Sequence, residues 1–498
     1  MILSIFGFLN KDLKIFNGIE ISQLDADVTF DGVRHAAGTW FIPMDQEFGN
    51  FVRQLFEVQD YPDLREYPEG PPDQPYDVAG WTLPYQMDVR VVEAASPVGA
   101  DVRGSMSLVM GEAIAWDSPT EDAEPFDSPI GVGFNSNAVA AGLVPPAGEI
   151  TGGGGQILID GRENNGYRFL NAALAAGAQL RLVPGERGEE GEPGTASRYA
   201  VSNFSGSDAL AGDLHLRATR GSASGPAVQK PRIGLYRPWN ASMDEGWTRW
   251  LIERYDFDFQ NLYNADVLAG DLSNRYDVII VVDMSGNQIM NGFAPGSVPA
   301  RYAGGIGSEG VRELDVFVRG GGTLVTLNAA SNWAIDAFHL PVRNVVADVG
   351  RSDFFMSGSI VEMDVDPSHP VMTGMPARAK VIVGRSPVFT TEEGFEGRVF
   401  AKYPKEGSPL LSGYLLGEEY LQGFAAGVEA TLGEGRVLLL GMRPQWRGQP
   451  FGNFRILFNA ALYSDGVADR TPDGAAFWTA PPEEDEEGEG EVGNGRGR

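Results

Sequence analysis

The sequence of 498 residues contains no cysteine and only four histidines. It therefore cannot form disulfides, thiolate metal ligands or a cysteine nucleophile. The histidines are far apart in the sequence, none is followed three residues later by glutamate, and His369, which precedes a proline, is predicted to be a turn residue. Zinc peptidases hold their metal with closely spaced histidine and carboxylate ligands, so we expect no zinc or other cofactor in this chain.

Positive charge is also scarce. The chain has 38 basic against 68 acidic residues, a net charge of −30. Such a chain repels phosphate backbones and anionic lipids, so nucleic acid is not an expected partner. No apolar run approaches the ~20 residues of a membrane span. The first apolar stretch is interrupted by Lys11, Asp12 and Lys14, so we expect neither a membrane span nor a signal peptide.

The length predicts about three domains, at about 150 residues per domain. Stretches rich in proline, glycine and small polar residues, such as Thr219–Pro231, are typical of exposed linkers. We therefore expect a fragment that begins near Lys230 to fold alone. The predicted units are an N-terminal α/β accessory region (1–128), a second α/β unit with a Gly-rich loop (129–225), a large α/β domain (230–480) and a disordered acidic tail (481–498).

Apolar periodicity predicts the architecture of the large domain. Buried strands are typically continuous apolar runs, and four such runs are separated by helical patterns: Arg232–Tyr236, Asp277–Val282, Gly322–Leu327 and Arg436–Leu440. This alternation predicts a doubly wound, mostly parallel sheet. Phe395–Leu432 instead predicts a hairpin-rich insertion, and Phe454–Leu462 predicts a helix with a buried face.

A helix is also predicted to begin at Ser242, because Ser242 and Glu245 have the spacing of a capping box. Helical spacing then places Trp247, Trp250 and Leu251 on one face.

Polar and aromatic residues directly follow the predicted strands. Ligands of open doubly wound sheets bind beyond the carboxyl ends of the strands, so we expect a pocket there lined by Tyr236, Arg237, Trp239, Asp283, Asn328, Arg443, Trp446 and Arg447. Alternatively, in so acidic a chain these arginines pair with carboxylates such as Asp244 or Asp283 in a structural network. A guanidinium left unpaired beside tryptophan would instead suit a carboxylate or a sugar-like ligand.

The sequence offers no nucleophile at the turn where one is expected. Cysteine hydrolases with such a sheet place the nucleophile on a sharp turn between a central strand and the next helix. Here Thr326–Ser331 occupies that position and contains no cysteine. Ser331 lacks the flanking Gly-x-Ser-x-Gly pattern, so we assign no catalytic residue.

Several motifs indicate a family resemblance. They are Ala37–Gln46 (AGTWFIPMDQ), Gln59–Arg65 (QDYPDLR), Pro75–Val78, Tyr236–Trp239 (YRPW), Met243–Trp250 and Arg443–Pro450 (RPQWRGQP). They resemble the region that follows the catalytic domain in large bacterial carboxypeptidase A-like zinc metallopeptidases, over nearly the whole chain. The resemblance implies that the second half is similar to a class I glutamine amidotransferase domain, with a flavodoxin-like sheet. It also implies that the complete protein is exported.

The catalytic motifs of that family have no counterpart in this chain. The family uses His-x-x-Glu, a later histidine ligand, a substrate-binding arginine and a glutamate base, all in an upstream domain that would also hold the zinc. The resemblance therefore implies a non-catalytic accessory portion whose partner is a metallopeptidase catalytic domain. The alternative is a stand-alone protein that binds a small polar or anionic ligand. A hydrolase with unfamiliar chemistry is the third hypothesis.

Overall fold

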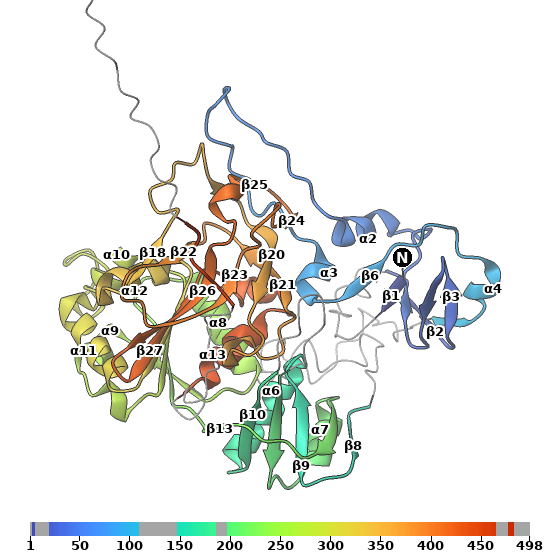
Figure 1. Cartoon of the computed structure of the whole chain (residues 1–498), viewed down its shortest axis with the longest axis horizontal. Coiled ribbons are helices and arrows are strands. Elements are labelled where there is room, and N and C mark those ends of the chain that lie inside the picture. The colour runs from blue at the N-terminus through green and yellow to red at the C-terminus, as the bar shows by residue number, and fades with distance from the viewer. Residues whose placement is uncertain (1, 5–18, 109–146, 186–196, 465–476, 483–498) are drawn as a thin grey trace, which may run out of the picture.

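The computed structural model describes residues 2–4, 19–108, 147–185, 197–464 and 477–482. Three main sheets organise these residues, and Figure 1 shows them as separate groups of strands. The chain is therefore an α/β protein, as predicted. The predicted boundary at 128/129 and most of the predicted tail lie outside the described residues. No helix among the described residues is both long enough and apolar enough to cross a membrane.

The N-terminal region is built on a five-stranded antiparallel sheet rather than on parallel units. Its order is β6 (Arg90–Val92), β1 (Ile2–Ser4), β5 (Trp40–Phe41), β2 (Ser22–Leu24) and β7 (Met106–Leu108). The region adds a hairpin, β3 (Val28–Phe30) and β4 (Val33–His35), and the helices α2 (Gly49–Phe56), α3 (Leu83–Met87) and α4 (Ala100–Arg103). Its own small core joins Val52 and Phe56 of α2 to Ile21 and Ile42.

The second unit has a six-stranded sheet. Its order is β13 (Ala227–Val228), β10 (Gln179–Val183), β11 (Arg198–Ser202), β9 (Gln156–Asp160), β12 (Arg217–Gly221) and β8 (Glu149–Gly152), with helices α6 (Asn164–Ala175) and α7 (Ser207–Asp213). The prediction of an exposed linker at Thr219–Pro231 is wrong, because β12 ends in it and β13 lies within it. Val228 is buried and pairs with Leu180. This pairing partner is distant in sequence, so local composition did not indicate the strand.

The C-terminal domain contains a twelve-stranded mixed sheet, of which one half is parallel. The parallel half has the order β15 (Phe259–Leu262), β14 (Ile233–Tyr236), β16 (Val278–Val281), β17 (Thr323–Leu327) and β27 (Gly435–Leu440). Its helices are α8 (Met243–Arg254), α9 (Asn264–Leu268), α10 (Gly286–Met290), α11 (Gly307–Arg319), α12 (Ala329–Phe338) and α13 (Phe454–Leu462). The four strands predicted for this domain are all present.

The other half of this sheet is antiparallel. It continues from β27 through β26 (Ala425–Leu432), β23 (Gly397–Lys402), β20 (Ser359–Val365) and β21 (Arg378–Val383). Attached to it are β18 (Val342–Asn344), β22 (Phe389–Thr391) and β24 (Leu410–Ser412), while β19 (Phe355–Met356) and β25 (Leu415–Leu416) form a separate two-stranded sheet. The prediction of a mostly parallel sheet is therefore wrong, and the hairpin-rich part begins near Val342 rather than at Phe395. The strands β20 and β21 are apolar runs, and such a run does not indicate whether a strand pairs in the parallel or the antiparallel direction.

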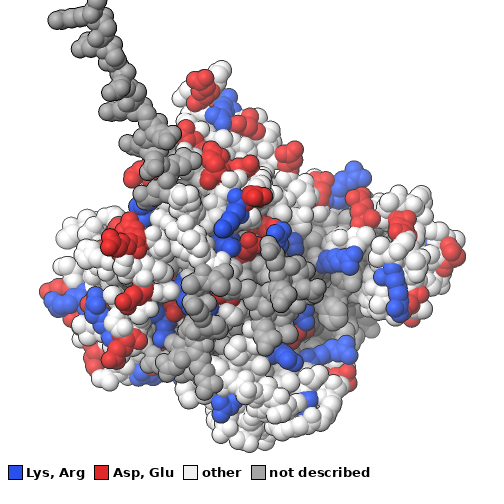
Figure 2. Space-filling view, in the orientation of Figure 1, with Lys and Arg blue, Asp and Glu red and all other residues white. Residues whose placement is uncertain are grey.

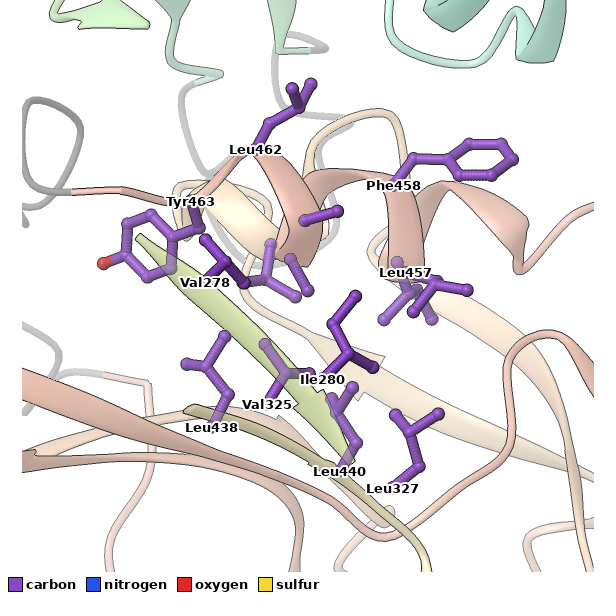
Figure 3. Close-up of a cluster of buried hydrophobic side chains, with 14 of the residues drawn as sticks. Val278, Ile280, Val325, Leu327, Leu438, Leu440, Leu457, Phe458, Leu462 and Tyr463 are labelled. Carbon is purple, nitrogen blue, oxygen red and sulfur yellow. The ribbon is translucent and has the colours of Figure 1, made fainter. Parts of the chain in front are cut away.

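Helices cover both faces of the parallel strands. Figure 3 shows the α13 residue Leu457 over the face that carries Val278 and Ile280. The alternate residues Ile279 and Val281 face the other way and contact side chains from α9, α11 and α12, namely Val267, Leu314 and Trp333. This double cover explains why the strands are continuous apolar runs.

The second unit and the C-terminal domain share one hydrophobic core. All nine residues of α13 are buried, because the sheet covers one side and the second unit covers another. Tyr167 packs its ring 4.9 Å from Phe458, and the hydroxyl groups of Tyr167 and Tyr199 both donate to Asn459 Oδ1 at 2.7 Å. The predicted boundary near 225–230 therefore separates two sheets but not two cores.

Candidate functional site

A sharp turn joins β17 to α12 at Asn328. Asn328 has φ 51° and ψ −120°, a conformation that residues other than glycine rarely adopt. Its backbone N–H donates to the Leu440 carbonyl at 2.7 Å. Asp283 Oδ1 accepts hydrogen bonds from the Asn328 carboxamide at 3.2 Å and from the Ala329 N–H at 3.0 Å. Asp283, which follows β16, therefore stabilises the strained turn.

The serine nearest this turn is not available for chemistry. Ser331 is fully buried within α12. Its hydroxyl donates to the Thr326 carbonyl at 3.2 Å and lies 3.0 Å from Thr326 Oγ1. The Ser331 hydroxyl therefore links the start of α12 to the end of β17.

Arg443 lies between two carboxylates at the same edge of the sheet. Its Nη1 is 3.6 Å from Asp244 Oδ2 and 3.4 Å from Asp283 Oδ2. The Gln445 carboxamide lies 3.5 Å from the other oxygen of Asp244. Burial raises the pKa of Asp244 to about 6, against the attraction of Arg443 and together with repulsion from Asp283. We call Asp244, Asp283, Asn328, Arg443 and Gln445 the acceptor cluster.

Two amide oxygens of the acceptor cluster lack donors. Asn328 is 3% exposed and Gln445 is fully buried. Yet Asn328 Oδ1 and Gln445 Oε1 have no hydrogen-bond partner among the described residues. A buried acceptor without a donor costs about 1–3 kcal/mol, so native proteins rarely leave two together. Both atoms are also closed to solvent, so an incoming ligand can reach them only by displacing the side chains that cover them.

Exposed aromatic rings extend this edge of the sheet beyond β14 and β15. Trp239 is 40% exposed. It stacks on Tyr263 with ring centroids 4.8 Å apart and an interplanar angle of 18°, and it meets Tyr302 edge-on at 4.6 Å. We call these three residues the aromatic platform. Arg237 and Arg301 flank it, with guanidinium carbons 5.9 Å from the Tyr263 ring and 4.5 Å from the Tyr302 ring, respectively.

The aromatic platform and the acceptor cluster lie at the same edge of the sheet. Arg237 Nε lies 3.7 Å from Glu245 Oε1, and Glu245 is adjacent to Asp244 in the first turn of α8. Both groups follow strands of the parallel half, at its carboxyl edge.

The eight residues predicted to line a pocket divide into three groups. Asp283, Asn328 and Arg443 meet in the acceptor cluster, and Arg237 and Trp239 lie at the aromatic platform. The others lie elsewhere: Tyr236 is buried and donates to Asn264 at 2.8 Å, and Trp446 and Arg447 stack together beside Asp77.

Sequence reasoning did not include Asp244 and Gln445 among the pocket residues. Asp244 was considered only as a possible partner of an arginine. Asp244 lies at the start of α8, after a strand and a loop, and this position indicates that it lies at the same edge of the sheet.

Arg447 forms a two-point ion pair with Asp77 of the N-terminal region. Its Nη1 and Nη2 lie 2.7 and 2.6 Å from the carboxylate oxygens. The Arg447 side chain also lies over the Trp446 ring at 4.4 Å. On the face shown in Figure 2, acidic and basic side chains are interspersed. Arg447 is thus paired with a carboxylate, although with neither of the two carboxylates considered from the sequence.

Replacing Arg447 with alanine is expected to lower the free energy of unfolding by only about 1 kcal/mol, because partly exposed ion pairs contribute little. The two side chains are 31% and 45% exposed. Chemical denaturation of the full chain measures the effect, and Asp77→Ala should match it. A loss above about 3 kcal/mol would instead be typical of a buried pair and would contradict this description.

Asp244 makes stability depend on pH. Its pKa is raised from 3.8 to about 6, so the folded chain holds this proton more tightly than the unfolded chain. The stabilisation is complete below about pH 4 and is lost as the pH rises through about 6. Asp244→Asn, which stays neutral, should match the wild type at pH 4 and exceed it at pH 8 by about 1–3 kcal/mol, since one pKa unit corresponds to about 1.4 kcal/mol.

Thermal midpoints across pH 4–8 measure this difference. The matched control is Asp336→Asn, which removes the same charge from an exposed position on α12. Equal pH profiles for Asp244→Asn and the wild type would show that Asp244 has an ordinary pKa.

A second set of ionisable side chains is buried near the amino end of β27. His369 Nε2 lies 3.0 Å from Glu429 Oε2, while His369 Nδ1 accepts from the Val371 N–H at 3.2 Å. Nε2 therefore carries the proton and donates to the carboxylate, and burial lowers the pKa of His369. Arg398 and Asp366 pair beside them at 3.0 Å. His369 is thus a turn residue, as predicted, and its buried pair stabilises the fold.

No group of three histidine or acidic side chains is arranged to hold a metal ion in the part of the chain that the structure describes. A hollow of about 400 Å³ lies on the sheet of the second unit, lined by Ile157, Asn203 and Arg220 among others. Arg220 is paired with Asp208 at 2.8 Å. This hollow therefore lacks a free charged group.

No protein-family model and no curated protein matches this sequence. Similar solved structures include a cytoplasmic protein of Salmonella typhimurium, with 14% identity and a TM-score of 0.30 over 47% of this chain and 98% of that one. A protein described as a GMP synthase component from Thermoplasma acidophilum has 8% identity and a TM-score of 0.29, over 46% of this chain and 92% of that one. A ThuA-like protein from Bacteroides uniformis has 14% identity and a TM-score of 0.26, over 48% of this chain and 92% of that one.

Proposed function

We propose that the chain is a non-catalytic binding module whose C-terminal domain has the plan of a class I glutamine amidotransferase. The strand order supports this plan. Numbered along the chain, the five parallel strands have the order 2-1-3-4-5, which is the flavodoxin-like order. Helices on both faces and a sharp turn after the fourth strand are further features that such a domain requires.

Asn328 carries the proposal. It occupies the strained turn where cysteine hydrolases of this architecture hold their nucleophile. A carboxamide has no nucleophilic atom at neutral pH, and this one is held by Asp283. A domain with this plan and this residue is suited to binding without turnover.

The ligand is proposed to be a small polar molecule rather than an anion. Arg443 faces Asp244 and Asp283, Arg447 faces Asp77, and Arg237 lies near Glu245. None of these three guanidinium groups is left to pair with a ligand carboxylate. The acceptor cluster instead favours a ligand that donates hydrogen bonds.

An accessory role beside a metallopeptidase catalytic domain is part of the proposal. It is supported by the motifs in Ala37–Gln46, Tyr236–Trp239 and Arg443–Pro450, and by the lack of the family's catalytic motifs. Zinc and peptide cleavage would then belong to the partner domain.

The purified full chain is assayed both for turnover and for ligand binding. We expect no ammonia from glutamine, no release from p-nitrophenyl esters and no C-terminal residue from peptides. We also expect the thermal midpoint to rise with neutral sugars or amines and not with carboxylic acids. Turnover that is lost in Asn328→Ala or in Ser331→Ala would overturn the proposal. So would chelator-sensitive peptide release with one zinc per chain.

A further inference from the structure

We propose that the edge formed by the acceptor cluster and the aromatic platform binds a neutral sugar ring. This inference rests on the proposed binding function and names the class of ligand. It is carried by two independent features, the stacked exposed tryptophan and the buried amide oxygens without donors.

The aromatic platform offers exposed aromatic surface against which a sugar ring can pack. The Trp239 ring is 40% exposed, and Tyr263 and Tyr302 fix its orientation from two sides. The face of an aromatic ring is electronegative, so it attracts the C–H groups on one side of a pyranose. Because the ring is held before the ligand arrives, little side-chain entropy is lost on binding.

The acceptor cluster offers the complementary polar contacts. Sugar hydroxyl groups need acceptors for their protons, and the acceptor cluster contains four: the carboxylates of Asp244 and Asp283 and the amide oxygens of Asn328 and Gln445. Arg443 lies among them and can donate to a hydroxyl oxygen. Hydrogen bonds to charged acceptors are stronger than those between neutral groups, so two or three of them set orientation and specificity.

Charge at the site disfavours the other small ligands. An anion would approach two carboxylates, and the cation nearest to them, Arg443, is already paired with both. A cation stacked on Trp239 would be repelled by Arg237 and Arg301, which flank the aromatic platform. A neutral ligand with several hydroxyl groups is repelled neither by the carboxylates nor by the arginines.

The experiment is a titration of the full chain with three sets of probes, monitored by tryptophan fluorescence and thermal midpoint. The sets are neutral methyl pyranosides of different stereochemistry, tetramethylammonium with spermidine, and citrate with glutamate. We expect saturable binding of at least one pyranoside, and none of the charged probes should compete with it.

Variants then locate the site. Trp239→Ala should weaken pyranoside binding by roughly three- to tenfold, as expected for one aromatic contact, and Trp239→Phe should restore part of the loss. Asp244→Asn should weaken it by about tenfold or more. The control Tyr76→Ala, which removes a fully exposed ring from the N-terminal region, should leave binding unchanged.

Each contrary outcome has a definite meaning. Binding of a charged probe at this edge, without pyranoside binding, would overturn the sugar inference and leave the binding function standing. Pyranoside binding that is insensitive to both Trp239→Ala and Asp244→Asn would also overturn it, because the sugar would then bind elsewhere. Binding of no probe in any set would overturn both proposals.

Discussion

Replacing His369 with alanine is expected to lower the free energy of unfolding by about 3 kcal/mol or more, as for the loss of one partner from a buried pair. The imidazole is fully buried and donates to Glu429, whose side chain is only 9% exposed. Without this donor the carboxylate would remain charged in an apolar setting. The loss of the ring would also leave the Val371 N–H without its acceptor and Phe400 without its stacked neighbour at 4.5 Å.

Denaturation of the full chain measures this loss, with His339→Asn as control. His339 is an exposed histidine at a left-handed position that asparagine tolerates. Equal stability of His369→Ala and His339→Asn would contradict the description of the pair.

The same pair should affect acid stability. Burial lowers the pKa of His369 below its ordinary value of 6.5, so the folded chain resists protonation there. Its contribution is present above pH 6.5 and is lost as the pH falls below that value. The wild type should therefore lose more stability on acidification than His369→Ala does.

A fragment spanning residues 230–482 is expected not to fold, in contrast to the prediction from sequence. Removing the second unit would expose the side of α13 that carries Phe458 and Asn459, together with Tyr255, whose carbonyl accepts from Asn171 at 2.9 Å. Each large apolar side chain contributes about 2 kcal/mol when buried. Exposing three or four of them costs about as much as the whole stability of a domain.

Circular dichroism and gel filtration of two fragments test this expectation. The fragment 230–482 should be unfolded or aggregated, whereas 147–482, which keeps the second unit, should be folded and monodisperse. Cooperative melting of 230–482 at the temperature of the longer fragment would show that the two cores are independent.

Local periodicity predicted those elements in which the pattern of apolar residues is regular from end to end. The helix Phe454–Leu462 has the predicted bounds, because its apolar pattern is regular. The face of α8 that Trp247, Trp250 and Leu251 share is not uniformly buried. Trp250 is 37% exposed, whereas Asp244, Glu245, Thr248 and Leu251 are buried. The buried polar residues of α8 are partnered mainly by Arg443, Gln445 and Arg249, two of which are almost 200 residues away.

The candidate site was predictable only where strand topology brings residues together. Asp283, Asn328 and Arg443 each follow a strand of the parallel half, so the rule for strand ends placed them at one edge. The pairing of Arg447 with Asp77 spans 370 positions and depends on how the N-terminal region docks. No local pattern indicates such a contact.

We propose that the carboxyl edge of the parallel strands is a ligand site, and that its two buried amide oxygens accept hydrogen bonds from the ligand. A crystal structure of the full chain with the tightest-binding pyranoside tests it most directly. We predict a sugar ring against Trp239, with hydroxyl groups within hydrogen-bond distance of Asn328 Oδ1 or Gln445 Oε1. A sugar bound elsewhere, or both amide oxygens accepting from the chain's own donors, would contradict the account.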